Sequence, residues 1–344
     1  QIRTARMMVA DAVQHRKCVK SCDAKQAFTN GQAERRVFID CPPGRAREYD
    51  PDTGAPLCYE ITKNCYGSPT APRQWNINMH NSMISFGFEQ RTCDQSLYTY
   101  RDLSVLVYTD DFMSTYPDTP AGQQLYKSFI DMLSSKYELR DDGMQDCVDF
   151  VGLHFEFSAD RSVCHITQPL KVQQLIESSG LGVCRPHFTP GTPNVLVSDL
   201  DCPAPDDVEQ LDFMKNKPYR RRIGQLLWLS RSTRPDISYQ VNALARVAHN
   251  PGKAHWEATT YLIRYIQHTS DYGLTYVRDP AFDDTPGQWK PVVWSDATWA
   301  PNYGSAYDNY RSTTGWMVSV GPNLVNWRSH RQPVVAQSST ESEW

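Results

Sequence analysis

Two adjacent aspartates, Asp110 and Asp111, have the residue types and the setting to do chemistry, because they interrupt an otherwise apolar segment. The residues VLVY (105–108) before them and FM (112–113) after them predict two strands joined by a turn. Aspartate is also common in ordinary turns, because its side chain bonds the nearby backbone. On its own, this pair therefore favours a solvated turn over a functional site.

A third acid, Asp23, changes that balance. The strand-like residues CVKSC (18–22) end at Asp23, and a short segment closed by Phe28 follows. Magnesium prefers carboxylate and other oxygen ligands, and two such ions about 3.5–4 Å apart can activate an attacking hydroxyl and stabilise a leaving oxygen. Acids from two separate strands would supply this clamp, so we expect Asp23, Asp110 and Asp111 to converge on one site.

Strands and helices alternate in the first 155 residues, which indicates an α+β domain that could position these acids. Past Pro120, apolar residues recur every three or four positions and predict a helix. Residues 150–157 alternate as one half-buried strand should. Residues 185–218 are rich in Pro, Asp and Asn and predict a linker. Residues 219–268 are helical in pattern, with a break at Pro235. Strand-like runs follow at 292–294, 316–320 and 325–327.

The composition of the 344 residues allows two or three globular domains, with 40% hydrophobic residues. The formal net charge of −4 argues against a nucleic-acid binder, although a local basic groove could form where arginines cluster. The arginines of that cluster are Arg220, Arg221, Arg222, Arg231 and Arg234. The ten cysteines include no C-x-x-C pair, which argues against a zinc site, and no apolar run could span a membrane. We expect a soluble, intracellular chain, with cut ends at Gln1 and Trp344.

Several ordered blocks resemble the reverse transcriptases of copia-type retrotransposons. In the first half these are DAKQAFTNG (23–31), VFI (37–39), PPG (42–44), YG (66–67), APRQW (71–75), YTDD (108–111) and FVGL (150–153). In the second half they are IGQLLWL (223–229), TRPDI (233–237), HNP (249–251), HW (255–256), WSDA (294–297), RSTTG (311–315) and SSTESEW (338–344). The blocks cover almost the whole chain in the family's order.

The resemblance implies an α+β fold: a palm of antiparallel sheet and packed helices with partial fingers, then thumb and connection helices, then an incomplete RNase H-like segment. The implied domains are 1–205 for the polymerase, 206–283 for the connection and 284–344 for the start of RNase H. The implied substrates are an RNA template, a DNA primer, deoxynucleotides and an RNA–DNA hybrid. Oligomers or complexes with other Pol products are also implied, in cytoplasmic virus-like particles or in the nucleus.

Site residues carry over by position in these blocks. Asp23, Asp110 and Asp111 would hold two Mg²⁺ ions, with Mn²⁺ as a substitute. The residues that would contact the nucleotide or template are Phe28, which would exclude a ribose 2′ hydroxyl, together with Tyr66, Arg73 and Gly67, whose backbone could approach the incoming base pair. Asp296 and Glu343 match the first two metal-binding acids of an RNase H site, with Glu341 the weaker candidate.

Some positions depart from the family pattern. Between Gly67 and Ala71 the usual Leu-Lys-Gln reads SPT (68–70), which removes a cation and adds a proline, and Thr298 stands where the family has a second Asp after Asp296. Only 22 residues precede Asp23, so the family's basic fingers segment is expected to be missing. Two alternatives to an active polymerase therefore stay open: a catalytically silent remnant that at most binds nucleic acid, and another two-metal nucleotidyltransferase on the same palm.

Overall fold

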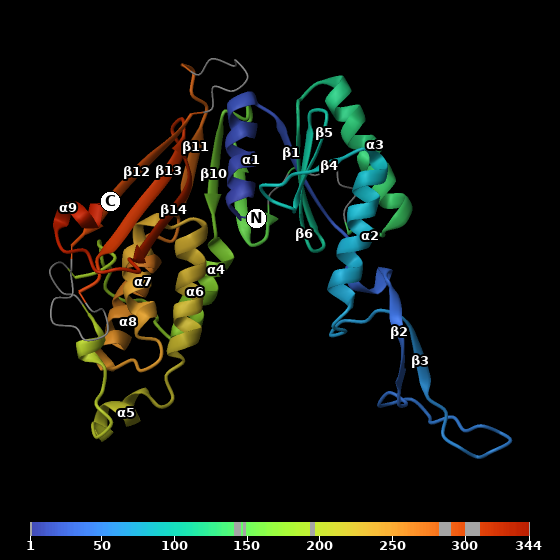
Figure 1. Cartoon of the computed structure of the whole chain (residues 1–344), viewed down its shortest axis with the longest axis horizontal. Helices are drawn as coiled ribbons and strands as arrows, with labels where there is room; N and C mark the ends of the chain where they lie inside the picture. Colours follow the sequence, from blue (N-terminus) through green and yellow to red (C-terminus); the bar gives the residue numbers. More distant parts are fainter. Residues whose placement is uncertain are drawn as a thin grey trace. The chain divides into compact units, whose positions relative to one another are not determined.

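The computed structural model describes residues 2–140, 146, 149–192, 197–281, 290–299 and 310–343 (Figure 1). Two compact units make up the chain: residues 17–151 with residues 3–5 form the first, and residues 6–16 with 152–344 form the second. Both combine helices with antiparallel sheets. The α+β class expected from the sequence is therefore correct at this level, while the domain boundaries at 205/206 and 283/284 stay predictions.

The first unit is built on a five-stranded antiparallel sheet with the order β1-β7-β6-β5-β4. Its strands are β1 (Cys18–Asp23), β4 (Glu89–Gln90), β5 (Leu97–Tyr100), β6 (Leu103–Tyr108) and β7 (Asp111–Tyr116). The helices α2 (Ala71–Phe86) and α3 (Pro120–Lys136) run along one face of this sheet (Figure 1). The short 3-10 helix η1 (Ala27–Asn30) follows β1, and the two-residue strand β8 (Asp149–Phe150) ends the unit.

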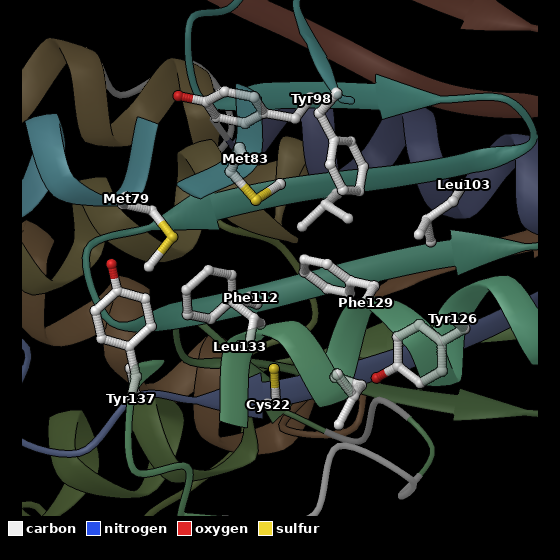
Figure 2. Packing of buried hydrophobic residues seen from close by; sticks show 14 of the residues in the cluster. Cys22, Met79, Met83, Tyr98, Leu103, Phe112, Tyr126, Phe129, Leu133 and Tyr137 are labelled. Atoms are coloured by element: carbon white, nitrogen blue, oxygen red, sulfur yellow. The ribbon is translucent and has the colours of Figure 1, made fainter. Parts of the chain in front are cut away.

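The core of the first unit lies between the sheet and these two helices. Figure 2 shows Phe112 of β7 beside Met79 and Met83 of α2 and Leu133 of α3, all buried. The buried side chains of α3 recur at three- and four-residue spacing, which confirms the helix predicted past Pro120. Side chains of β1 and β7 thus pack in one core with side chains of α2 and α3, which holds both strands in place.

A hairpin of β2 (Gln32–Ile39) and β3 (Tyr59–Lys63) leaves the sheet and extends away from the rest of the first unit (Figure 1). Val37, Phe38 and Ile39 are all more than a third exposed there. An isolated two-stranded hairpin buries little apolar surface, so it contributes little to stability on its own.

One expected strand is wrong in detail. Residues 150–157 do not form a single strand, because β8 ends at Phe150 and β9 (Leu153–Phe157) begins after a tight turn. The turn residues Val151 and Gly152 have φ values of 52° and 74°. Two left-handed residues in succession reverse the chain, which alternation of apolar side chains could not reveal.

The second unit combines a helical layer with two antiparallel sheets. The strands β9, β10 (Val163–Thr167) and β11 (Leu274–Val277) belong to one sheet. The strands β12 (Pro291–Thr298), β13 (Thr313–Val320) and β14 (Asn323–Arg331) form the other sheet. Its helices are α1 (Ile2–His15), α4 (Pro169–Ser179), α5 (Val208–Met214), α6 (Tyr219–Ser232), α7 (Ser238–Arg246), α8 (Lys253–His268) and α9 (Ser339–Glu343). The short 3-10 helices are η2 (Asp199–Asp201) and η3 (Pro235–Ile237).

Most elements expected in this half are confirmed, including the break at Pro235 and the three strands near the C-terminus. The expected linker at 185–218 is only partly correct, because it contains η2 and α5. A polar side chain precedes each of these helices and accepts a hydrogen bond from a backbone N–H of the first turn: Ser198 for η2 and Asp207 for α5. Such caps stabilise short helices that have no apolar periodicity. No helix among the described residues is long and apolar enough to cross a membrane.

Candidate active site

The backbone brings the three predicted aspartates to one end of two neighbouring strands. Asp23 is the last residue of β1 and Asp111 the first of β7, and the antiparallel register pairs these two residues directly. Asp110 precedes Asp111 in the turn between β6 and β7. The structure therefore brings together the residues that the sequence separates by 87 positions.

The turn that carries Asp110 is held from two sides. Tyr108 pairs with Asp111, which leaves Thr109 and Asp110 as a two-residue turn, and Thr109 has a φ of 56°. The indole Nε1 of Trp75 donates to the Thr109 carbonyl at 2.6 Å, and the Ala24 N–H donates to the Asp110 carbonyl at 2.8 Å. Both carbonyl groups of a strained turn are thus fixed, so the position of the two acids is set by the surrounding fold.

The charges at this end of the sheet are not balanced. Burial, and then the carboxylates of Asp110 and Asp23, raise the pKa of Asp111 to about 6, while Arg140 opposes this shift. The guanidinium Nε of Arg140 lies 3.0 Å from Oδ2 of Asp23, and the Arg140 N–H donates to the Asp23 carbonyl at 2.8 Å. Arg140 was not singled out from the sequence, because nothing in its local pattern distinguishes it from a surface arginine.

The three carboxylates are a plausible donor set for Mg²⁺, since they are hard oxygen ligands whose mutual repulsion a cation would relieve. In the arrangement described, however, Asp23 faces Arg140, and no group of three His, Cys, Asp or Glu side chains in the described residues is gathered as a metal site. The donor set fits a metal, whereas the present side-chain positions would have to adjust to bind it.

Phe28 lines a pocket of about 190 Å³ next to the turn between β6 and β7. Trp75, Tyr98 and Thr109 contribute to its walls. The ring of Phe28 is half-buried on η1 and meets the ring of Tyr66 edge-on, with 5.4 Å between centroids. Phe28 therefore lies where its side chain can shape a small polar pocket, in addition to packing against the core.

Tyr66, Gly67 and Arg73 lie on the surface around the start of α2. Tyr66 is 62% exposed, and Arg73 is exposed on α2 itself. Gly67 has a φ of 90°, and a Cβ atom there would meet nothing within 4 Å. The glycine is therefore required by its left-handed backbone, and no protein atom explains it by close approach.

Comparison with known proteins identifies the family of the chain. The family model described as reverse transcriptase (RNA-dependent DNA polymerase) matches residues 1–193, which is more than half of the chain. The chain belongs to the reverse transcriptase family. Its resemblance to copia-type elements is also confirmed, because Pol polyproteins of such transposons match over most of its length.

Three relatives illustrate the coverage. The retrovirus-related Pol polyprotein from transposon RE2 of Arabidopsis thaliana is 29% identical over 98% of this chain, and that from transposon TNT 1-94 of Nicotiana tabacum is 26% identical over 95%. This reverse transcriptase chain spans only 21% and 23% of those two polyproteins. The putative transposon Ty5-1 protein of Saccharomyces cerevisiae is 26% identical, and the match covers 96% of that protein.

A second pair of acids meets in the second unit of the chain. Asp296 lies on β12, and its Oδ1 accepts the Ala297 N–H at 2.9 Å. Oε1 of Glu343, on α9, accepts the same N–H at 3.3 Å. Glu341 instead accepts the Gln337 N–H at 2.6 Å and so caps α9. The structure thus brings Asp296 and Glu343 together and gives Glu341 a local structural role.

The expected basic groove of five arginines is wrong for two of them, Arg222 and Arg234, whereas Arg220, Arg221 and Arg231 are exposed. Arg222 is 5% exposed and Arg234 is 1% exposed, so both belong to the interior of the second unit. Arg222 stacks over Trp256 at 3.6 Å, and Arg234 pairs with Asp236 and donates to Thr269. Sequence clustering could not separate these buried arginines from surface cations, because helical periodicity sends neighbouring residues to opposite faces.

Proposed function

We propose that this chain supplies the polymerase part of a copia-type Pol protein and extends a DNA primer on an RNA template. The observation that carries this proposal is the pairing of Asp23 with Asp111, beside Asp110 in a turn held by Trp75 and Ala24. Membership of the reverse transcriptase family supports the same substrate class, namely template, primer and deoxynucleotides.

Asp23, Asp110 and Asp111 would hold two Mg²⁺ ions, for which Mn²⁺ can substitute. When bound, the metal would activate the primer 3′ hydroxyl and stabilise the charge that develops on the transferred phosphate. The protein would act mainly by positioning: β1 and β7 fix the acids, and the two held carbonyl groups keep the turn in place.

The surrounding residues would select and hold the nucleotide and template. Phe28 and its pocket would pack against the sugar and exclude a ribose 2′ hydroxyl. Tyr66 and Gly67 would lie near the incoming base pair, and Arg73 is exposed on α2, where it could contact a template phosphate. Arg140 would have to release Asp23 as the metal binds, which leaves its guanidinium available to a phosphate.

For the second unit, we propose that β12 to β14 and α9 form the beginning of an RNase H-like domain that recognises an RNA–DNA hybrid. Asp296 and Glu343 would be its first two metal ligands, a role that their shared Ala297 N–H supports. Residues 206–283 would form the connection. We further propose that the chain acts with other Pol products, in cytoplasmic particles or the nucleus, since it spans about a fifth of the first relatives it matches.

The test is primer extension on an RNA template by the purified chain with Mg²⁺. We expect extension by the parent and none by Asp110→Asn, which keeps the size of the side chain and removes its charge. Asp102→Asn is the matched control, because Asp102 is exposed at the β5–β6 turn. Extension by Asp110→Asn at the parent rate would reject the assignment of this turn.

Thermal unfolding separates a silent remnant from an active enzyme. A chain that binds Mg²⁺ at this site should be stabilised by the ion, and Asp110→Asn should lose that stabilisation. If neither extension nor Mg²⁺-dependent stabilisation occurs, the chain is a remnant that has lost the polymerase function.

A further inference from the structure

The segment of residues 183–191 lies along one face of α8 in the second unit. Near its start, Sγ of Cys184 donates to Oε1 of Gln267 at 3.0 Å. Near its end, the hydroxyl of Thr189 lies 3.1 Å from that of Tyr261. Because Tyr261 and Gln267 lie on the same helix, the segment is fixed to α8 at two points and its side chains have defined positions.

Two ring pairs form between this segment and α8. His187 stacks on Tyr261 with 3.7 Å between centroids and 17° between planes. Phe188 meets the ring of His268 edge-on at 4.9 Å. The pair orients Phe188 without burying it, since 76% of this side chain remains exposed. The phenyl ring therefore has a defined orientation and remains accessible to a ligand.

Two arginines flank these rings. Arg264 lies on α8 between Tyr261 and His268, and Arg185 lies two residues before His187. Burial, and then the positive charges of Arg264 and Arg185, lower the pKa of His187. Arg185 is exposed, whereas Arg264 is half-buried and its Nε is buried without a hydrogen-bond partner. Glu257 and Asp271 are the exposed acids near this face of α8, but neither arginine makes an ion pair in the described part of the chain.

Two arginines of the β2–β3 hairpin, in contrast, have a partner ion within the hairpin. Arg36 pairs with Glu60 at 2.7 Å, and Arg47 pairs with Asp40. The charges of Arg36 and Arg47 are thus paired within the hairpin, whereas Arg185 and Arg264 have no partner ion in the residues that the structure describes. Free guanidinium groups next to exposed rings are the combination that single-stranded nucleic acids require, since phosphates bind the cations and bases stack on the rings.

We propose that this α8 surface binds single-stranded nucleic acid, with a base on Phe188 and backbone phosphates on Arg185 and Arg264. The residues of the α8 surface are Arg185, His187, Phe188, Tyr261, Arg264 and His268. The choice of partner rests on the proposed polymerase function, which requires an unpaired template. An acidic peptide would also meet the two arginines, but it would gain little from the phenyl ring.

The experiment measures binding of a short fluorescent RNA to the full chain in EDTA, over a range of salt concentrations. The affinity of the parent should decrease as salt increases. In the double variant Arg185→Gln/Arg264→Gln this salt dependence should be weaker, with the slope of log affinity against log salt smaller in magnitude by about 1.4, because each phosphate contact on a single strand contributes about 0.7. Phe188→Ala should weaken binding about tenfold at fixed salt, since it removes one stacked base.

The matched control is Lys215→Gln/Arg221→Gln, which removes two exposed cations of the same unit that make no ion pair in the described residues. The control should bind as the parent does. Equal losses in both double variants, or no loss in either, would overturn the proposal. Loss only in the arginine variant, with Phe188→Ala unchanged, would also overturn it and indicate a site for a general polyanion.

Two further results separate this surface from the polymerase site. A 4-thiouridine RNA should cross-link to residues 183–191, and Asp110→Asn should bind RNA as the parent does. If extension fails but the cross-link forms, the proposed function is wrong and the surface stands. If extension succeeds but no cross-link forms and binding is unchanged in the variants, the surface is wrong and the polymerase stands.

Discussion

At the scale of single residues, the carboxylates of Asp23, Asp110 and Asp111 lie close enough to repel one another. This repulsion lowers the stability of the fold, and a bound cation would relieve it. Burial, and then the neighbouring carboxylates, raise the pKa of Asp111 to about 6, which means that ionising this carboxyl is less favourable than ionising an ordinary aspartate. Only Arg140 opposes this effect among the groups that shift Asp111. Sites that concentrate like charge commonly sacrifice stability for function.

Asp110→Asn should therefore stabilise the protein when no divalent ion is bound. Removing one charge beside Asp111 should raise the free energy of unfolding by about 1 kcal/mol, since each unit of pKa shift corresponds to about 1.4 kcal/mol. Urea unfolding in EDTA measures this effect, with Asp102→Asn as the control for charge alone. In Mg²⁺ the order should reverse, because the parent gains binding energy that the variant lacks. A variant less stable than the parent in EDTA would contradict the argument.

Trp75 is the residue through which α2 positions the turn. It is 3% exposed, and its indole makes one hydrogen bond, to the Thr109 carbonyl. Trp75→Phe keeps an aromatic ring but removes the donor, so the turn should become less well fixed. A hydrogen bond of this kind contributes about 1 kcal/mol, so we expect kcat for primer extension to fall about fivefold with KM little changed.

The control for Trp75 is Trp299→Phe, which removes a comparable bond from an indole to the Ala336 carbonyl at 2.9 Å in the other unit. Circular dichroism should show that both variants fold. Equal kcat values for Trp75→Phe and the parent would mean that the turn keeps its shape without this hydrogen bond.

At the scale of elements, the sequence predicted what local periodicity and charge placement determine. The hairpin of β6 and β7, the helix α3 and the break at Pro235 all followed from residue patterns. The partnership of Asp23 with Asp111 was expected from the chemistry of metal-binding carboxylates and from the family resemblance, because register across 87 residues has no local signal. Arg140 and the α8 surface could not be predicted at all, since both depend on which distant segments pack together.

The blocks TRPDI and HW, quoted for the resemblance, turn out to contain buried polar side chains that join segments of the second unit. Arg234 donates to the carbonyl of Thr269, and His255 links Gly252 to Ser198. His255 has no exposed surface, accepts the Gly252 N–H at Nδ1 and lies 2.7 Å from the Ser198 carbonyl at Nε2. This bonding pattern requires the neutral ring with its proton on Nε2.

Stability should consequently decrease as the pH falls below about 6.5, the ordinary pKa of histidine in an unfolded chain. Burial lowers the pKa of His255 in the folded state, although Ser198, Asp201 and Asp199 oppose this. Above pH 6.5 the ring is neutral in both states and carries no penalty. Below it the unfolded chain binds a proton that the folded chain does not, which costs up to about 1.4 kcal/mol per pH unit.

Urea unfolding between pH 8 and pH 5.5 checks this expectation. His255→Gln should lower stability at pH 8 but reduce its pH dependence, because the titrating group is gone. His165→Gln is the control, since His165 is exposed and contacts only the Thr275 hydroxyl among the bonds described for its ring. If the parent and His255→Gln lose stability equally over this range, other groups control the response.

At the scale of the whole molecule, the two units differ in how complete their candidate sites are. The first unit contains all three acids of the polymerase assignment on adjoining strands. The second unit brings together only Asp296 and Glu343, both exposed, at the end of a three-stranded sheet. Val293 of β12, at 61% exposed, and Trp294, at 47%, show that part of this sheet is open to solvent.

The 344-residue chain by itself should therefore show no RNase H activity, even if it extends primers. Hydrolysis by two metal ions requires several carboxylates around the scissile phosphate, and in the part of the second unit that the structure describes only Asp296 and Glu343 of the proposed ligands come together. The assay is release of labelled fragments from an RNA strand paired with DNA, in Mg²⁺ or Mn²⁺. Asp296→Asn is the matched variant, and it should leave primer extension unchanged because Asp296 lies in the other unit. Cleavage by the parent that disappears in Asp296→Asn would show that further ligands complete the site, whereas cleavage that persists in the variant would point to a contaminating nuclease.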